Sequence, residues 1–285
     1  MALPQPIKDL GSAALSKVAD KFVDFVIIKY TGKSIKTFEA EGDIEADKIR
    51  TKWELLEKPF WLQAESLKMG RQYNNLAKTL LKAAPMIAAP VNNIADGNDA
   101  FWGLLEHSKE ISNEGMQELI AKIIAGEYNA PGTYSMSTLQ ILKMLGKSEL
   151  ELFERTASLM INDSQIPQDI FSSSESSREL TAKCGVDFGK LQLLQSLGLV
   201  LPNAMEKVIQ NTLKAKLDIL YFDKKISFEP NLTEEAGATE IRLPSYFGLS
   251  PVGKQILQHL TPKFNDVYFF WLQNNYKVSG YRLVG

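Results

Sequence analysis

The chain has 285 residues, of which 32 are Lys or Arg, 34 are Asp or Glu, two are His and one is Cys. A chain of this length forms one large domain or two ordinary ones. The net charge of -2 gives no overall attraction to nucleic acid or to anionic lipid. A single Cys excludes an internal disulfide framework and a Cys-based zinc cluster, and two His residues leave no multi-His metal site. We therefore expect neither a metal nor a cofactor.

Residues 7–30 form the first expected helix, because apolar residues recur there every three or four positions. Its last part, residues 22–30, is apolar nearly all round and contains Phe22 and Phe25. Such a helix needs cover on more than one side, which favours burial against the rest of the fold or a second copy of the chain. The alternative is an interfacial membrane helix, although its mixed charges attract anionic lipid only weakly.

The N-terminus does not resemble a targeting segment. Residues 3–12 contain prolines and charges where a secretory signal needs an apolar core. The sequence also lacks a run of apolar residues long enough to cross a bilayer. We expect a cytoplasmic chain, with peripheral attachment to the inner membrane as the alternative.

A long polar helix, or two, is expected over residues 36–84, where charges of both signs are densely interleaved. Pro59 should kink or end it, and an aromatic pair follows directly. A long helix with so few apolar residues has little core of its own and leans on a partner helix, within a homo-oligomer or from a protein partner. The expected interface residues are Phe22, Phe25, Phe60 and Trp61.

Four helices are expected between Asp99 and Ile161, with short loops that imply antiparallel neighbours. Asp99 caps the first, Ser112 or Asn113 caps the second, and a capping box from Ser148 to Glu151 opens the fourth. The second helix is the most regular, because its apolar residues follow the helical spacing without interruption. Those residues are Met116, Leu119, Ile120, Ile123 and Ile124.

Glu127 lies at the end of the second of these helices, where the helix dipole opposes a carboxylate. It should therefore have a partner, and the nearest donors are backbone N–H groups at the start of the next helix, around Ser135 to Thr138. We predict that Glu127 binds that helix start and fixes the Pro131-Gly132 turn. A catalytic or ligand-binding Glu127 is the alternative.

The C-terminal third combines helical and strand patterns after a polar linker at 162–177, whose FSSSESS run is the best candidate domain boundary. The expected elements are a helix-turn-helix over 178–200, a helical stretch over 206–216, a hairpin over 217–229 turning at Asp223-Lys224, a strand over 240–243, a helix after Ser250, and a terminal helix and strand over 264–285. The predicted fold is mainly α. It comprises long N-terminal helices (1–90), a helical core (91–165) and a small winged-helix-like α+β C-terminal domain (166–285).

In a DNA-binding winged helix, the helix at 187–197 would enter the major groove, and the hairpin would contact the phosphate backbone. The lysines placed for such contacts are Lys190, Lys224 and Lys225. Specific DNA binding usually rests on more phosphate contacts than three lysines provide. A protein-interaction or packing role is therefore favoured, and DNA binding stays open as an alternative.

Residues that catalyse reactions are not arranged in a recognisable motif. The sequence has no P-loop, no dinucleotide-binding glycine pattern and no nucleophile elbow. Cys184 has no His near it in sequence, which favours an inert, buried thiol. His107 and His259 lie on helical patterns, where packing or exposure explains them. The sequence favours a function without catalysis, and an enzyme with a noncontiguous site around Glu127 is the alternative.

The stretch 111–153 combines several short motifs: Met116-Gln117 near a helix start, Gly126-Glu127 at its end, the turn Pro131-Gly132 before Tyr134-Ser135, and a helix with Leu139, Leu142 and Phe153. Together they resemble the domain-of-unknown-function family 2806. The segments 71–75, 185–200 and 249–257 are similar to further parts of that family. Ile120 departs from the family pattern, which often has Trp there.

The resemblance implies a helical bacterial protein without an assigned enzyme activity, from mobile or defence-associated loci. It supplies no catalytic residues, and its structural motif consists of Gln117, Gly126, Glu127, Pro131, Gly132 and Ser135. With the patterns above, it favours a non-catalytic, self-associating interaction or scaffold protein in antiphage defence. The alternatives are a DNA-binding regulator and a peripheral membrane effector that acts through residues 7–30.

Overall fold

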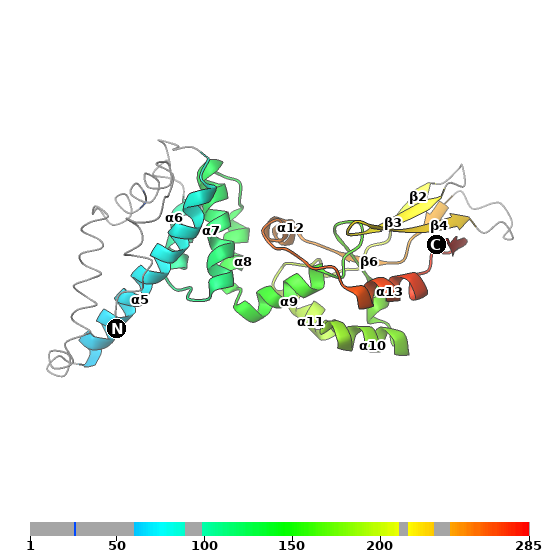
Figure 1. Ribbon diagram of the computed structural model, residues 1–285, viewed down its shortest axis with the longest axis horizontal. Helices are drawn as coiled ribbons and strands as arrows, with labels where there is room; N and C mark the ends of the chain where they lie inside the picture. Colours follow the sequence, from blue (N-terminus) through cyan, green and yellow to red (C-terminus); the bar gives the residue numbers. More distant parts are fainter. Residues whose placement is uncertain (1–25, 27–59, 89–98, 211–215, 231–239, 285) are drawn as a thin grey trace. The chain divides into compact units, whose positions relative to one another are not determined.

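A computed structural model describes Val26 and residues 60–88, 99–210, 216–230 and 240–284 (Figure 1). The chain divides into two compact units between Lys143 and Met144. The described part is mainly helical, and its small antiparallel sheets lie in the C-terminal part. The predicted mainly α fold with a C-terminal α+β region is therefore confirmed.

The first unit is built around α7 (Glu114–Asn129). Its neighbours are α5 (Phe60–Ala83), the short η2 (Ala84–Met86), α6 (Asp99–Ser108) and α8 (Met136–Met144). All five apolar residues predicted to line one face of α7 are buried, and both α5 and α6 pack against this helix. Of the two predicted caps, Ser112 and Asn113, it is Asn113 that caps α7, because its side chain accepts a hydrogen bond from Met116 N at 3.1 Å.

Two amides fix the connection between α6 and α7. The side chain of Asn75, on α5, donates to Lys109 O at 2.8 Å and to Ser112 Oγ at 3.2 Å. Gln117 is almost fully buried and donates to Ile111 O at 2.9 Å. Buried amides of this kind satisfy the backbone of a turn that has no regular secondary structure.

His107, on α6, should make the stability of the first unit depend on pH. Its burial lowers its pKa, and this effect is opposed by a hydrogen bond with the backbone of Leu142. The unfolded chain therefore takes up this proton more readily, so stability is full above pH ~6.5 and falls as the pH drops towards the lowered pKa. Urea unfolding measures the free energy of unfolding at pH 8 and at pH 5.5. Between these two pH values, this free energy should fall less in His107→Gln than in the native chain. Equal losses would contradict this.

The second unit alternates short helices and strands. Its elements are α9 (Lys147–Ala157), β1 (Gln165–Pro167), η3 (Gln168–Phe171), α10 (Glu175–Cys184), α11 (Phe188–Ser196), β2 (Val208–Gln210), β3 (Leu217–Tyr221), β4 (Lys224–Pro230), β5 (Glu240–Arg242), β6 (Tyr246–Gly248), α12 (Pro251–Leu257), α13 (Asp266–Asn275) and β7 (Tyr281–Leu283). The strands pair antiparallel as β1–β6, β2–β5 and β3–β4–β7.

Strand β6 lies between two segments. On one side it pairs with β1, with Ile166 opposite Phe247. On the other side, Leu201 N donates to Gly248 O at 2.8 Å, and Met205 forms a bridge with Tyr246. The pairing of β2 with β5 continues this second contact, so residues 200–210 and 240–249 run antiparallel as one long ribbon, and β3 and β4 lie between its two arms in the sequence.

Three sequence predictions about this unit need correction. Residues 208–210, expected to be helical, form β2, because the β-branched Val208 and Ile209 pair with β5. The segment 162–177 is not a polar linker, since Ile166 and Ile170 are buried within it. The capping box of α9 is formed by Glu149, whose carboxylate accepts from Gly146 N at 3.0 Å, and not by Ser148 and Glu151.

The remaining strands and helices follow the expected order. The hairpin forms from β3 and β4, with Phe222-Asp223 as its loop, one residue earlier than predicted. Ser250 caps α12 by accepting from Gly253 N at 2.9 Å. The terminal helix and strand are α13 and β7. The three-part division at residues 90 and 165 stays a prediction about folding domains.

Candidate functional site

The Glu127 carboxylate is fully buried at the end of α7. One oxygen accepts a hydrogen bond from Gly132 N at 2.6 Å, and the other accepts from Tyr134 N at 3.2 Å. These donors lie in the turn itself, before the predicted Ser135-to-Thr138 stretch. Gly132 has a φ of 85°, and Pro131 precedes it, as in a type II turn. Glu127 thus holds the turn that reverses the chain into α8.

Gly126 and Tyr134 complete this corner. A Cβ at Gly126 would lie 2.6 Å from the hydroxyl oxygen of Tyr134, so only glycine lets the buried tyrosine ring lie against α7. Burial, helped by the charge of Glu127, raises the pKa of Tyr134. Ser135 then starts α8, where its hydroxyl accepts from Thr138 N at 3.1 Å. A buried carboxylate with two backbone donors is a structural cap, and the geometry offers it no open position for a substrate.

The three lysines considered for nucleic acid each have an acidic neighbour. Lys190 lies 3.7 Å from Asp187 and also donates to Gly185 O. Lys224 lies 3.4 Å from Asp223. Lys225 lies 3.0 Å from Asp218, and hydrogen bonds from Ser227 and Lys225 lower the pKa of that carboxyl. Exposed ion pairs are weak, but these carboxylates cancel the local positive charge that phosphate binding needs.

The exposed side of α11 is partly apolar, and Lys190, which pairs with Asp187, is the one charged residue of this helix. Leu191 and Leu194 point into the core, which leaves the opposite side of the helix to solvent. That side comprises Gln192, Leu193 and Ser196, with Phe188 at its edge; Phe188 and Leu193 are 47% and 43% exposed. The ring of Phe188 also packs against those of Phe171 and Phe247, at 6.0 and 6.5 Å between centroids. We call these four residues the α11 face.

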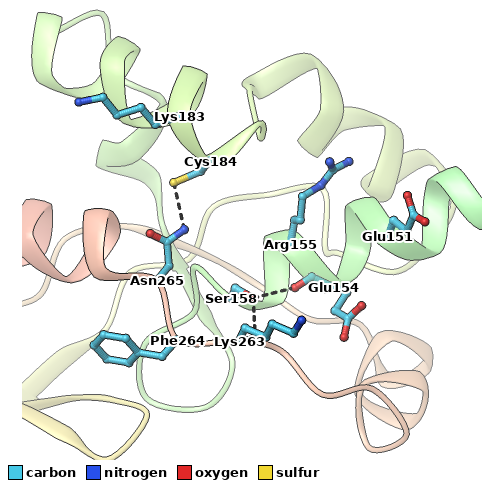
Figure 2. A pocket seen from close by; sticks show the side chains of 9 residues that line it. All are labelled: Glu151, Glu154, Arg155, Ser158, Lys183, Cys184, Lys263, Phe264 and Asn265. Carbon is cyan, nitrogen blue, oxygen red and sulfur yellow. Dashed lines mark hydrogen bonds between the residues drawn. The ribbon is translucent and has the colours of Figure 1, made fainter.

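A pocket of about 420 Å³, within the range of small-molecule sites, lies beside α9 and α10 (Figure 2). Its lining residues are Glu151, Glu154, Arg155, Ser158, Lys183, Cys184, Lys263, Phe264 and Asn265. The Asn265 amide donates to the sulfur of Cys184 at 3.5 Å, yet burial raises the pKa of this thiol. In Figure 2, Lys183 points away from Cys184, so the cations do not converge with the thiol on one point. The geometry therefore gives neither an activated nucleophile nor a focused anion site.

The sequence missed this pocket because its walls come from three separate segments. The one local signal is Asn265, which precedes α13 and caps it by accepting from Tyr268 N at 3.0 Å. Within the described ranges, His, Cys, Asp and Glu side chains form no group of three or more that could hold a metal ion.

The structure describes only part of the predicted N-terminal interface. Phe22 and Phe25 lie outside the described residues, and for Phe60 and Trp61 only their helical backbone in α5 is described. Val26 is fully buried, so this position of the expected first helix contacts protein. None of the helices described in the structure combines the length and the hydropathy needed to cross a bilayer.

Comparison with known proteins identifies one relationship. A family model described as a protein of unknown function, DUF2806, matches residues 63–273. No curated protein and no solved structure matches the chain. The matched range contains the α7–α8 corner, the α11 face and the pocket beside Cys184. The chain belongs to the DUF2806 family.

Proposed function

We propose that this chain is a non-catalytic interaction protein that self-associates, with the α11 face as a contact between copies. The observation that carries the proposal is the lack of charge on this exposed, partly apolar face. Apolar side chains that gather on a surface commonly mark a protein contact. In an interface between two identical faces, each charged residue lies near the same charge on the other copy, and the two repel. A face without charge avoids this repulsion and is therefore suited to bind its own copy.

The order of elements supports a winged-helix-like module. A helix, α9, is followed by β1, then by α10 and α11, and then by the antiparallel ribbon of β2 and β5, which has β3 and β4 inserted and continues into β6, the partner of β1. In DNA-binding proteins with a helix-turn-helix, the second helix enters the major groove. Here α11 is the second helix in that order of elements. Apart from Lys190, which pairs with Asp187, its exposed side chains are uncharged, which favours contact with protein over contact with phosphate.

The oligomeric state tests the proposal. We expect light scattering on a sizing column to give at least twice the 31.9 kDa chain mass. Leu193→Lys should lower this mass, because it places a cation opposite its own copy. The control is Leu283→Lys, since Leu283 is 41% exposed on β7 and matches Leu193 at 43%. A native mass of one chain, or no effect of Leu193→Lys, would contradict the proposal.

DNA binding is the second candidate, because the winged-helix-like order of elements favours it. The same column, recorded at 260 nm, would reveal bound nucleic acid. A salt-dependent shift with duplex DNA that disappears in Lys224→Glu/Lys225→Glu would favour this candidate. Leu193→Lys separates the two functions, since it should weaken self-association while adding positive charge to α11.

The resemblance to defence-associated proteins extends the proposal to bacterial cells. In this setting, self-association would be needed for protection against phage. Leu193→Lys should then reduce protection in a plaque assay at equal protein level, whereas Leu283→Lys should not. If Leu193→Lys and Leu283→Lys protected cells equally well, the α11 face would not be needed for protection against phage.

A further inference from the structure

Three residues with unusual backbone conformation meet at one place in the second unit. Asn162, Asp163 and Phe222 have φ values of 48°, 66° and 52°, and no other non-glycine residue in the described ranges has a positive φ. Left-handed backbone is tolerated by Asn and Asp but is an outlier for an aromatic residue. Strain of this kind persists where the surrounding structure enforces it, and it clusters at functional sites.

The two turns that contain these residues are fastened to each other. Asn162 N donates to Leu220 O at 2.8 Å, and Leu220 N donates to the Asn162 side-chain oxygen at 3.0 Å. The turn after α9 is thereby attached to the edge of β3, next to the hairpin loop that begins with Phe222. The unusual backbone at both turns is therefore part of one rigid arrangement.

A pocket of about 200 Å³ lies between these turns, and we call it the Phe222 pocket. Its lining residues are Ala157, Met160, Asp163, Phe222, Leu257 and Pro262. The walls are apolar except for Asp163. An apolar cavity of roughly 150 Å³ holds a benzene molecule, so this space is large enough for one aliphatic or aromatic side chain.

Phe222 presents an aromatic surface at the rim of the pocket. Its side chain is 44% exposed, and its ring lies 5.0 Å from that of Tyr221 and 5.8 Å from that of Phe264, measured between ring centroids. Phe264 in turn contacts Phe269. A ring held in this way loses little freedom when a partner covers it, which is typical of aromatic anchors at interfaces.

Asp163 defines the charge of the partner. Its carboxylate is exposed, and in the described part of the chain no cation lies within ion-pair distance of it. The neighbouring Asp223 is different, because it is paired with Lys224 at 3.4 Å. An apolar pocket with one unpaired carboxylate at its rim is complementary to an apolar group beside a cation.

We propose that the Phe222 pocket binds a peptide segment of another protein that presents an apolar side chain next to a basic one. The apolar side chain fills the space between Met160 and Leu257, and the basic group meets Asp163. This site lies outside the α11 face, so it can fail or succeed independently of self-association.

Benzamidine is the first probe, because it joins an aromatic ring to a cation; benzoate, its anionic counterpart, is the control. Binding is followed through the methyl signal of Met160 in protein labelled at methionine methyl groups. We expect benzamidine to bind about fivefold more tightly than benzoate. Asp163→Asn should abolish this preference, and Asp223→Asn should leave it unchanged. Equal binding of both probes, or no shift of the Met160 signal with either, would overturn the proposal.

A peptide series tests whether the natural occupant is a protein segment. The probe is acetyl-Ala-Ala-Leu-Arg-Ala-Ala-amide, compared with versions in which Leu is replaced by Ala or Arg by Glu. We expect both replacements to weaken binding several-fold, and Phe222→Asn, which tolerates the left-handed turn, to remove it. Binding of benzamidine without discrimination among the peptides would assign the pocket to a small molecule instead. A lowered oligomer mass in Phe222→Asn would assign it to a second copy.

Discussion

Replacing Gly253 with alanine should destabilise the second unit by at least about 3 kcal/mol, because the new methyl group would strike backbone. A Cβ at this position would lie 2.1 Å from Leu199 O. That oxygen cannot move freely, since it also accepts a hydrogen bond from Ser250 N at 3.0 Å. The first turn of α12 therefore packs against the backbone of the residues that follow α11. Thermal unfolding should show a loss of roughly 10 °C.

Two other glycines provide controls for this prediction. A Cβ at Gly248 would meet the flexible end of Met205, which can rotate away, so Gly248→Ala should cost clearly less than Gly253→Ala. A Cβ at Gly103, in α6, would meet only the flexible end of Lys143, at an ordinary contact distance of 3.8 Å, so Gly103→Ala should be neutral or stabilise by up to about 1 kcal/mol. Similar melting temperatures for Gly253→Ala and Gly248→Ala would show that α12 does not pack as described.

Glu127→Gln should cost about 2–3 kcal/mol, although it changes the shape of the side chain very little. The carboxylate accepts two backbone hydrogen bonds through its two oxygens, whereas the amide has one oxygen and would point its NH2 group at the second donor. The fully buried site offers no water to replace the lost bond. Chemical unfolding measures the loss directly.

Glu114→Gln is the matched control for Glu127→Gln. Glu114 lies in the first turn of the same helix, its side chain is 81% exposed, and it pairs with Lys82 at 3.2 Å. An exposed pair of this kind contributes little, so this substitution should change stability by less than about 1 kcal/mol. If Glu127→Gln were as mild as Glu114→Gln, the carboxylate would have to serve a purpose other than holding the turn.

Patterns that depend on neighbouring residues were predictable from the sequence. The apolar face of α7 and the Asn113 cap are examples, since both are determined within one or two helical turns. The need for a partner at Glu127 followed from the helix dipole, but its donors could not be placed because the turn geometry depends on Gly132 having a positive φ. Helical periodicity does not report the conformation of the residues between helices.

Features that depend on distant residues were missed. Residues 208–210 were expected to be helical because their strand partner, β5, lies about thirty residues later in the chain. Ile166 appeared to belong to a polar linker because Phe247, which pairs with it, is more distant still. The Phe222 pocket combines residues from three separate segments, 157–163, 222 and 257–262. Long-range pairing and burial decide these structures, and local propensity is too weak to oppose them.

Self-association through the α11 face is the central claim of this account, and an intermolecular distance tests it most directly. Cys184 is the only cysteine, so Cys184→Ser provides a background in which a single spin label can be placed. A label at Gln192→Cys should give one narrow distance between copies, shorter than the distance from a label at Leu283→Cys. Absence of an intermolecular distance at position 192, or a longer distance there than at position 283, would contradict the α11 interface.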